Sequence, residues 1–234
     1  MQCVILAGGL GTRMRGRAGA LPKALIPVLG RPFIAYQLEW LARQGVRRIV
    51  LSIGYRGDMI AAAVGDGSAF GVSVAYSNED DALRGTGGAV RLAADLGLLE
   101  AGFFVLYGDS YLPLQYRPVA DSFHRSGKLG LMTVYHNQGK YDTSNVVYRD
   151  GQIVVYDKKA KLPEMHHIDY GLSLFKASVF DAYPASQVFD LAEVMGNLVK
   201  QHQLAGYEVP ERFYEMGSPS GLKELEELLG KDRI

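Results

Sequence analysis

The chain has 234 residues, 48% of them hydrophobic and 21% charged, as is usual for a soluble globular protein. Its 25 lysines and arginines balance 25 aspartates and glutamates, so no net charge attracts nucleic acid or an anionic membrane. The single cysteine, Cys3, excludes an internal disulfide and fits a small buried side chain. No apolar run approaches the ~18 residues of a membrane span, and the first expected strand begins at residue 2, without a signal peptide before it. We expect a cytoplasmic protein.

The first half of the chain alternates between strand and helix patterns. Strands are expected over residues 2–7, 47–53, 72–77 and 102–109. Helices are expected over residues 32–45, 57–67 and 87–99. This alternation, with short glycine-containing connections, predicts parallel βαβ units and a sheet covered on both faces. Ligands of such sheets bind beyond the carboxyl ends of the strands.

From about residue 116 the pattern becomes richer in strands. A helix is expected over 118–127, a hairpin turning at Asp150 and Gly151 over 145–157, and a helix over 190–204. Further strands are expected over 128–137, 167–175, 204–209 and 212–216. Ser218 can cap a closing helix whose first residue is Pro219. We therefore expect one α/β domain of three parts: a nucleotide-binding part (1–115), a smaller β-rich lobe (116–214) and a C-terminal helix (215–234).

A glycine loop with cationic side chains follows the first expected strand. The stretch LAGGLGTRM lacks the third glycine of the dinucleotide fingerprint, because Met14 stands in its place, and it is not a P-loop. Glycines let backbone N–H groups approach phosphate oxygens closely. Arg13 can fork onto one phosphate, and Lys23, ten residues later, can place a point charge on another. This combination suits a triphosphate better than a monophosphate.

The loop and three later motifs resemble the sugar-1-phosphate nucleotidyltransferase family. LAGGLGTRM followed by PKALIPV is similar to its signature, and YSNEDDALRGTGGAV, YGDS and FYEMGSPSGLKEL are similar to its later elements. In outline the chain resembles the short forms that act on heptose 1-phosphate, mannose 1-phosphate or N-acetylmuramate 1-phosphate. The resemblance implies a Rossmann-like, GT-A-type fold with a mostly parallel sheet. It also implies nucleotidyl transfer from an NTP, by in-line attack on the α-phosphate, to give an NDP-sugar and pyrophosphate.

Such a reaction needs two anions brought together and the charge between them neutralised, which calls for Mg²⁺. Asp109, at the end of an apolar strand and beside Gly108, is the expected metal ligand. Glu215 occupies the slot where the family usually has a second aspartate, and we expect it to serve as the other ligand. The expected catalytic residues are Arg13, Lys23 and Asp109.

The resemblance also assigns the two ends of the substrates. The residues expected to bind the nucleotide are Leu6, Ala7, Gly8, Gly9, Gly11, Thr12, Arg13, Lys23, Glu79, Gly85, Thr86, Gly87 and Gly88. The glycines among 85–88 open a helix, whose free N–H groups could meet the base or ribose. The residues expected to border the sugar are Asn145, Lys158, Lys159, Asp169, Tyr170 and Gly171, with either lysine as the phosphate contact.

Several alternatives stay open at the level of sequence. GTP or UTP with a heptose or hexose 1-phosphate is the expected pair, but the sequence does not separate the bases, and Arg84 adds a residue to the base loop. Glu215, the altered lysine pair and Arg84 also fit a homologue that binds a nucleotide or nucleotide sugar without catalysis. Transfer to a non-sugar phosphate such as phosphocholine is a third reading. A homo-oligomer is compatible with the sequence, and neither a nucleic acid nor a membrane is expected as a partner.

Overall fold

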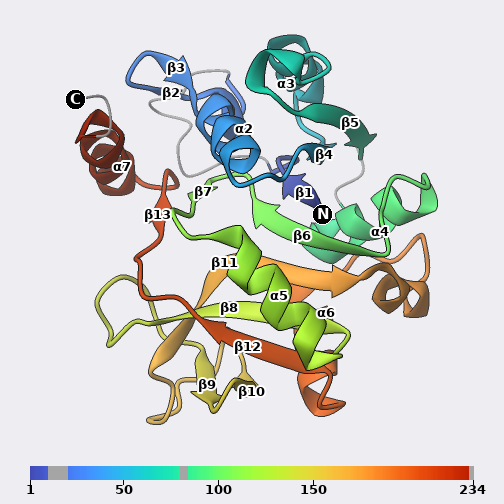
Figure 1. Cartoon of the computed structure of the whole chain (residues 1–234), viewed down its shortest axis with the longest axis vertical. Coiled ribbons are helices and arrows are strands. Elements are labelled where there is room, and N and C mark those ends of the chain that lie inside the picture. The colour runs from blue at the N-terminus through green and yellow to red at the C-terminus, as the bar shows by residue number, and fades with distance from the viewer. Residues whose placement is uncertain (10–20, 80–83, 232–234) are drawn as a thin grey trace.

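The computed structural model describes residues 1–9, 21–79 and 84–231. Its main strands are β1 (Gln2–Leu6), β4 (Arg48–Ile53), β5 (Ser73–Asn78), β6 (Gly102–Tyr107), β8 (Gly130–His136), β9 (Val146–Arg149), β10 (Gln152–Tyr156), β11 (His167–Lys176) and β12 (Leu204–Glu208). These nine strands form one sheet in the order β5-β4-β1-β6-β11-β8-β12-β10-β9 (Figure 1).

The amino-terminal part of the sheet is parallel. β1 pairs in parallel with β4 on one side and β6 on the other, and β4 pairs in parallel with β5. The strand order therefore reverses beside β1, which is where open α/β sheets bind ligands. β11 pairs antiparallel with both β6 and β8, so the β-rich part continues the same sheet. The predicted α/β class is confirmed.

Helices cover both faces of the sheet. They are α2 (Phe33–Arg43), α3 (Gly57–Val64), α4 (Gly85–Asp95), α5 (Tyr116–Ser126) and α6 (Leu191–Lys200). A further helix, α7 (Pro219–Lys231), packs outside the main sheet. Successive side chains of a strand point to opposite faces. Cys3 and Ile5 accordingly join one core with α2, α3 and α5, whereas Val4 joins the other with α4 and α6. None of the helices in the described ranges is long and apolar enough to cross a membrane.

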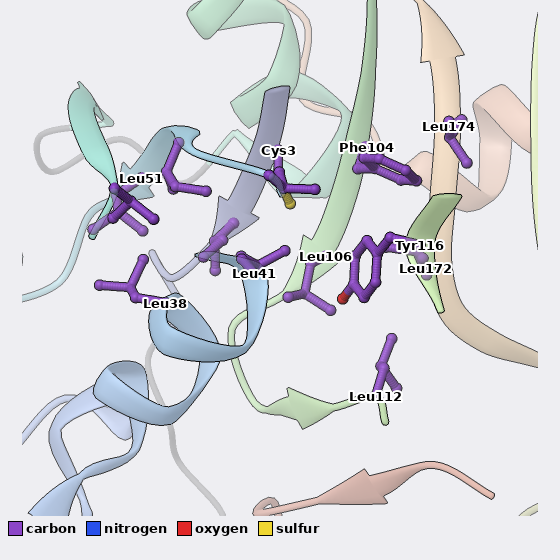
Figure 2. Packing of buried hydrophobic residues seen from close by; sticks show 14 of the residues in the cluster. Cys3, Leu38, Leu41, Leu51, Phe104, Leu106, Leu112, Tyr116, Leu172 and Leu174 are labelled. Atoms are coloured by element: carbon purple, nitrogen blue, oxygen red, sulfur yellow. The ribbon is translucent and has the colours of Figure 1, made fainter. Parts of the chain in front are cut away.

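The first core fixes the strand ends that will carry the site. Leu41 of α2 lies beside Leu106 of β6, and Tyr116 packs against Phe104 with ring centroids 5.2 Å apart (Figure 2). Cys3 is fully buried in this core, as predicted, and burial raises the pKa of its thiol well above the ordinary value. It therefore serves as a packing residue.

Two small strand pairs lie outside the main sheet. β2 (Pro27–Val28) pairs with β3 (Arg31–Pro32), and β7 (Ser110–Tyr111) pairs with β13 (Tyr214–Glu215). The sequence did not predict β7. The strand pair β7–β13 lies beside α7 (Figure 1). A third apolar cluster, which includes Tyr111, Met216 and Leu225, joins the pair to this helix.

Two local predictions from turn and cap chemistry are confirmed. Asp150 and Gly151 turn the β9–β10 hairpin with φ values of 48° and 77°, as a tight turn of that type requires. Ser218 Oγ accepts a hydrogen bond from the Gly221 N–H at 3.1 Å and so caps α7.

Candidate active site

Glycines follow β1 and β6 where the carboxyl ends of these two strands lie side by side. A Cβ added at Gly108 would lie 2.6 Å from the Leu6 carbonyl oxygen, and one at Gly8 would lie 2.5 Å from Glu79 Oε1. Only glycine lets the backbone after β6 approach the end of β1 so closely. The predicted phosphate-binding residues that lie outside the described residues are Gly11, Thr12 and Arg13.

Lys23 reaches the same edge of the sheet from a different segment. It opens a short 3-10 helix, Lys23–Leu25, after Pro22 in an extended conformation. Its Nζ lies 2.9 Å from Asp109 Oδ2, and the two side chains are 18% and 35% exposed. The lysine predicted to contact phosphate and the carboxylate predicted to hold a metal are therefore adjacent and reachable from solvent.

The strand pair β7–β13 brings Glu215 beside Asp109. Glu215 pairs with Ser110 in this ladder, and the Met216 N–H donates to the Asp109 carbonyl oxygen at 2.9 Å. A Cβ added at Gly217 would lie 2.9 Å from Glu215 Oε2 and 3.5 Å from Lys23 Nζ. The two carboxylates and the ammonium thus gather at one place, although more than a hundred residues separate Asp109 from Glu215.

A first cavity of about 440 Å³ opens on one side of Asp109. It is lined by Leu6, Ala7, Gly8, Gly9, Lys23, Ala24, Glu79, Gly85, Thr86, Ala89, Tyr107, Gly108, Asp109 and Asp190. Its lysine lies at the end next to Asp109, and two further carboxylates, Glu79 and Asp190, come from other elements. Most of the residues predicted to bind the nucleotide that the structure describes line this cavity.

Glu79 is the most buried acid of the first cavity. Its side chain accepts hydrogen bonds from the Ser52 hydroxyl at 3.4 Å and from the Arg84 N–H at 3.1 Å, and the residue is 7% exposed. Burial raises the pKa of this carboxyl above its usual range, against the lowering effect of the two hydrogen bonds. The folded protein therefore binds the Glu79 proton more tightly than the unfolded chain.

This raised pKa predicts a pH-dependent effect of Glu79→Gln on stability. An ionised Glu79 disfavours the folded state, and the penalty appears as the pH rises from the ordinary glutamate pKa of 4.5 through the higher folded value. Thermal denaturation at a series of pH values should show the variant gaining stability over the wild type at pH 8, with the gain vanishing below pH 4. A gain that is the same at every pH would contradict the assignment.

Protein acceptors occupy three of the first four N–H groups of the helix that begins at Gly85, contrary to the sequence-based expectation of free N–H groups. The N–H groups of Gly87 and Gly88 both donate to the Phe189 carbonyl oxygen, at 3.0 and 3.1 Å, and the Thr86 N–H donates to Asp190 Oδ1 at 3.2 Å. The segment before α6 packs on this turn, and a Cβ at Gly87 would lie 2.5 Å from the Phe189 ring. The absence of side chains at these glycines therefore lets the segment that contains Phe189 pack against the turn. Gly85 and Thr86 line the cavity, whereas Gly87 and Gly88 do not.

A second cavity, of about 680 Å³, opens on the other side of Asp109. It is lined by Tyr107, Asp109, Ser110, Lys140, Tyr141, Asp142, Thr143, Asn145, Lys158, Ile168, Asp169, Tyr170, Gly171, Arg212, Phe213, Glu215, Ser218, Ser220, Gly221 and Glu224. Tyr107 and Asp109 line both cavities. The end of β6 therefore stands between two spaces that together can hold two ligands.

Asn145 and Asp169 form one wall of the second cavity. Asn145 Oδ1 accepts from the Asp169 N–H at 3.0 Å, and Asp169 Oδ1 accepts from the Gly171 N–H at 3.0 Å. Gly171 has φ 101°, which explains a glycine at this bend of β11. The Tyr156 hydroxyl donates to Asp169 Oδ2 at 3.2 Å, and burial raises the pKa of the Asp169 carboxyl. The wall is thus held by its own hydrogen bonds.

The structure separates the two lysines that the sequence left open. Lys158 lines the second cavity, with its Nζ 5.9 Å from the centre of the Tyr107 ring. Lys159 does not line it, and the Asp157 carboxylate accepts its backbone N–H at 2.7 Å. Its side chain is exposed. Of the pair, Lys158 is the residue placed to meet a ligand.

Sequence reasoning missed Asp190 and Arg212. Asp190 carried a visible signal as the first residue of a predicted helix, but nothing placed it against Thr86. Arg212 lay in a predicted strand and now lines the second cavity. Both positions depend on contacts between segments far apart in the chain, which periodicity and motifs do not report.

The donors at Asp109 and Glu215 fit a hard divalent cation. Both offer carboxylate oxygens, and the ammonium of Lys23 against Asp109 shows that this carboxylate accepts a cation. Among the described residues there is no group of three or more His, Cys, Asp or Glu side chains that could hold a metal. A pair of carboxylates is the set expected for a cation that completes its shell with water and phosphate oxygens.

The fold and this site define an α/β protein with two cavities that meet at Asp109. The sequence pattern of the nucleotidyl transferase family matches residues 2–229. The chain belongs to this family.

Several relatives share nearly the whole length of the chain. A D-glycero-alpha-D-manno-heptose 1-phosphate guanylyltransferase from Aneurinibacillus thermoaerophilus is 27% identical over 231 residues, covering 98% of each chain. An N-acetylmuramate alpha-1-phosphate uridylyltransferase from Neisseria meningitidis is 30% identical over 240 residues, covering 98% of this chain and 99% of the other. The solved structure of HddC from Yersinia pseudotuberculosis with GMP-PN superposes with a TM-score of 0.80 at 24% identity, covering 97% and 99%. That likeness supports the fold.

Proposed function

We propose that this protein transfers a nucleotidyl group from an NTP to a sugar 1-phosphate and releases pyrophosphate. One observation carries the proposal: Asp109 stands where the two cavities meet, with Lys23 on the side of the first and Glu215 on the side of the second. A centre of this kind suits the joining of two anionic ligands. Full-length similarity to enzymes named for guanylyl and uridylyl transfer to sugar 1-phosphates supports the same reaction.

The reaction is a phosphoryl substitution that the side chains position. An oxygen of the sugar phosphate attacks the α-phosphorus of the NTP and forms a new P–O bond. The bond from the α-phosphorus to the oxygen bridging to the β-phosphate breaks, and the electron pair leaves with pyrophosphate. Because the sugar phosphate is already ionised, no general base is needed, and catalysis rests on orientation and charge stabilisation. Lys23 is placed to neutralise phosphate charge from the first cavity.

Asp109 and Glu215 would hold Mg²⁺, which supplies charge neutralisation between the two phosphates when it is bound. Glutamate extends one methylene further than the aspartate usual at this position in the family. The site is open enough for that length, because Glu215 is exposed and its neighbour Gly217 carries no side chain. The proposed roles of Lys158, Asn145 and Asp169 lie at the sugar end, in the second cavity.

The distribution of charge also orients the nucleotide. Lys23 lies beside Asp109, whereas Glu79 and Asp190 line the same cavity without a lysine partner among the described residues. A triphosphate is repelled by the latter carboxylates, so its base and ribose, which carry N–H and O–H donors, face them. GTP or UTP is the proposed donor, with a heptose or hexose 1-phosphate as acceptor.

Pyrophosphate release tests the proposal. Each of GTP, UTP, CTP, ATP and dTTP is incubated with heptose, mannose, glucose and N-acetylated sugar 1-phosphates, with Mg²⁺ or with a chelator. We expect release only when an NTP, a sugar 1-phosphate and the metal are all present. Tight nucleotide binding without release in any combination would favour a non-catalytic homologue. Release with phosphocholine and with no sugar phosphate would point to a different acceptor.

A further inference from the structure

Arg212 is held unusually firmly at the wall of the second cavity. Its guanidinium carbon lies 4.2 Å from the centre of the Tyr141 ring and 4.4 Å from that of Tyr214. Its Nε–H donates to the Phe213 carbonyl oxygen at 3.2 Å, and Nη2 donates to Glu224 Oε2 at 2.6 Å. An arginine in contact with two aromatic rings and hydrogen-bonded at two nitrogens is preorganised for binding.

Glu224 reaches this arginine from α7, so the pair joins the C-terminal helix to the segment before β13 (Figure 1). Both residues line the cavity, and their side chains are 28% and 47% exposed. The two hydrogen bonds described use two of the five N–H donors of arginine. The remaining donors and the second carboxylate oxygen of Glu224 are reachable by a ligand. At such exposure the ion pair itself adds little stability, which leaves recognition as its main effect.

The charges around the cavity define what the pair can recognise. Among the described lining residues, three side chains are cationic (Lys140, Lys158, Arg212) and five are carboxylates (Asp109, Asp142, Asp169, Glu215, Glu224). Asp109 and Glu215 are assigned to the metal, and Lys158, whose Nζ lies 5.9 Å from the centre of the Tyr107 ring, is assigned to the phosphate. The other charged side chains of the lining carry more negative than positive charge, and Arg212 is already paired with Glu224. Apart from Lys140, the charged side chains left for a second anionic group on the sugar are carboxylates and the already paired Arg212.

We propose that Arg212 and Glu224 read hydroxyl groups of an uncharged sugar and so select sugar 1-phosphates that carry no charge beyond the phosphate. The inference rests on the proposed function and narrows its acceptor. A hydroxyl both accepts from the guanidinium and donates to the carboxylate, so it satisfies both members of the pair. A carboxylate on the sugar satisfies Arg212 alone and is repelled by Glu224.

A matched pair of acceptors tests the selection. N-acetylglucosamine 1-phosphate and N-acetylmuramate 1-phosphate differ by one acidic lactyl ether, and mannose 1-phosphate adds a plain neutral hexose. With the NTP that supports turnover, kcat/KM for the neutral sugars should exceed that for the acidic one by about 100-fold. Glu224→Gln should lower this ratio of neutral to acidic kcat/KM by about 10-fold. Equal use of both N-acetylated sugars, or a preference for the acidic one, would overturn the inference.

The arginine is tested with Arg212→Lys, which keeps the charge but loses the planar fork. We expect KM for the neutral sugar 1-phosphate to rise about 10-fold, with kcat and KM for the NTP nearly unchanged. Glu227→Gln on α7, whose carboxylate faces Lys223 at the surface, is the control. Melting curves confirm that the variants fold. Variants of Arg212 and Glu224 that behave like the control would refute the pair's role.

If no combination of substrates releases pyrophosphate, the proposed function is wrong, but the preference for neutral sugar phosphates can still be tested by binding. Calorimetric titration of the wild type and the Arg212→Lys and Glu224→Gln variants with the same three sugar phosphates then reports binding alone. Binding of the neutral sugars that weakens in both variants supports the inference. Binding that is strongest for N-acetylmuramate 1-phosphate, or is unchanged in both variants, overturns it.

Discussion

Asp109→Asn should reduce kcat for pyrophosphate release by about 1,000-fold while leaving the fold intact. The amide keeps the size of the side chain but removes the charge that faces Lys23 and the proposed metal. Stability should change by less than about 1 kcal/mol, because the ion pair is partly exposed and solvent screens it. Steady-state release of pyrophosphate, with melting curves in parallel, measures both effects.

The matched control for this variant is Asp121→Asn on α5, where the aspartate is exposed and lines neither cavity. It should retain wild-type turnover. An unchanged rate for Asp109→Asn would remove Asp109 from the metal site. Loss of rate together with loss of the folded state would instead make it a structural residue.

Lys23→Met should lower kcat/KM for the NTP by about 100-fold, because the stem of the side chain remains while its charge is lost. Lys23 lines the first cavity and contacts Asp109, so the NTP loses its neutralising partner and Asp109 loses its neighbour. KM for the sugar 1-phosphate should change less than that for the NTP. Initial rates over a grid of both substrate concentrations separate the two constants.

Lys200→Met, at the exposed end of α6, controls for the loss of one positive charge. The double variant Asp109→Asn with Lys23→Met adds a second check, because residues in contact are not additive. Its loss of rate should fall short of the product of the two single losses. Independent, multiplicative effects would show that the two side chains do not act at one centre.

Most of the elements, and the edge of the sheet that carries the candidate site, were predictable from local sequence. Apolar runs of strand length, helical periodicity and glycines at strand ends indicate a parallel α/β sheet, and the carboxyl ends of β1 and β6 then meet at the site. Lys23 and Asp109 were predicted from the motifs that contain them, PKALIPV and YGDS. The resemblance of these motifs to a known family predicts the reaction without any knowledge of tertiary contacts.

Other features depended on contacts between distant segments. The glycines that begin α4 resemble a ligand-binding turn, yet Phe189 takes the N–H groups of Gly87 and Gly88. The choice of Lys158 over Lys159 came from a turn stabilised by Asp157. The contact with Phe189 joins segments that are far apart in the chain, so the sequence does not show it. The two adjacent lysines have the same chemistry and differ only in the direction that the folded backbone gives their side chains.

The sequence by itself determined the α/β class, the buried strands and the chemical kinds of side chain available at their ends, because these follow from periodicity and residue type. The tertiary structure supplied the β7–β13 pairing that brings Glu215, which the family resemblance had already paired with Asp109, to its place. It alone decided that Arg212 meets Glu224 at the wall of the second cavity. The physical reason is that a hydrogen-bonded strand pair or an ion pair joins residues by their positions in space, which spacing along the chain does not encode.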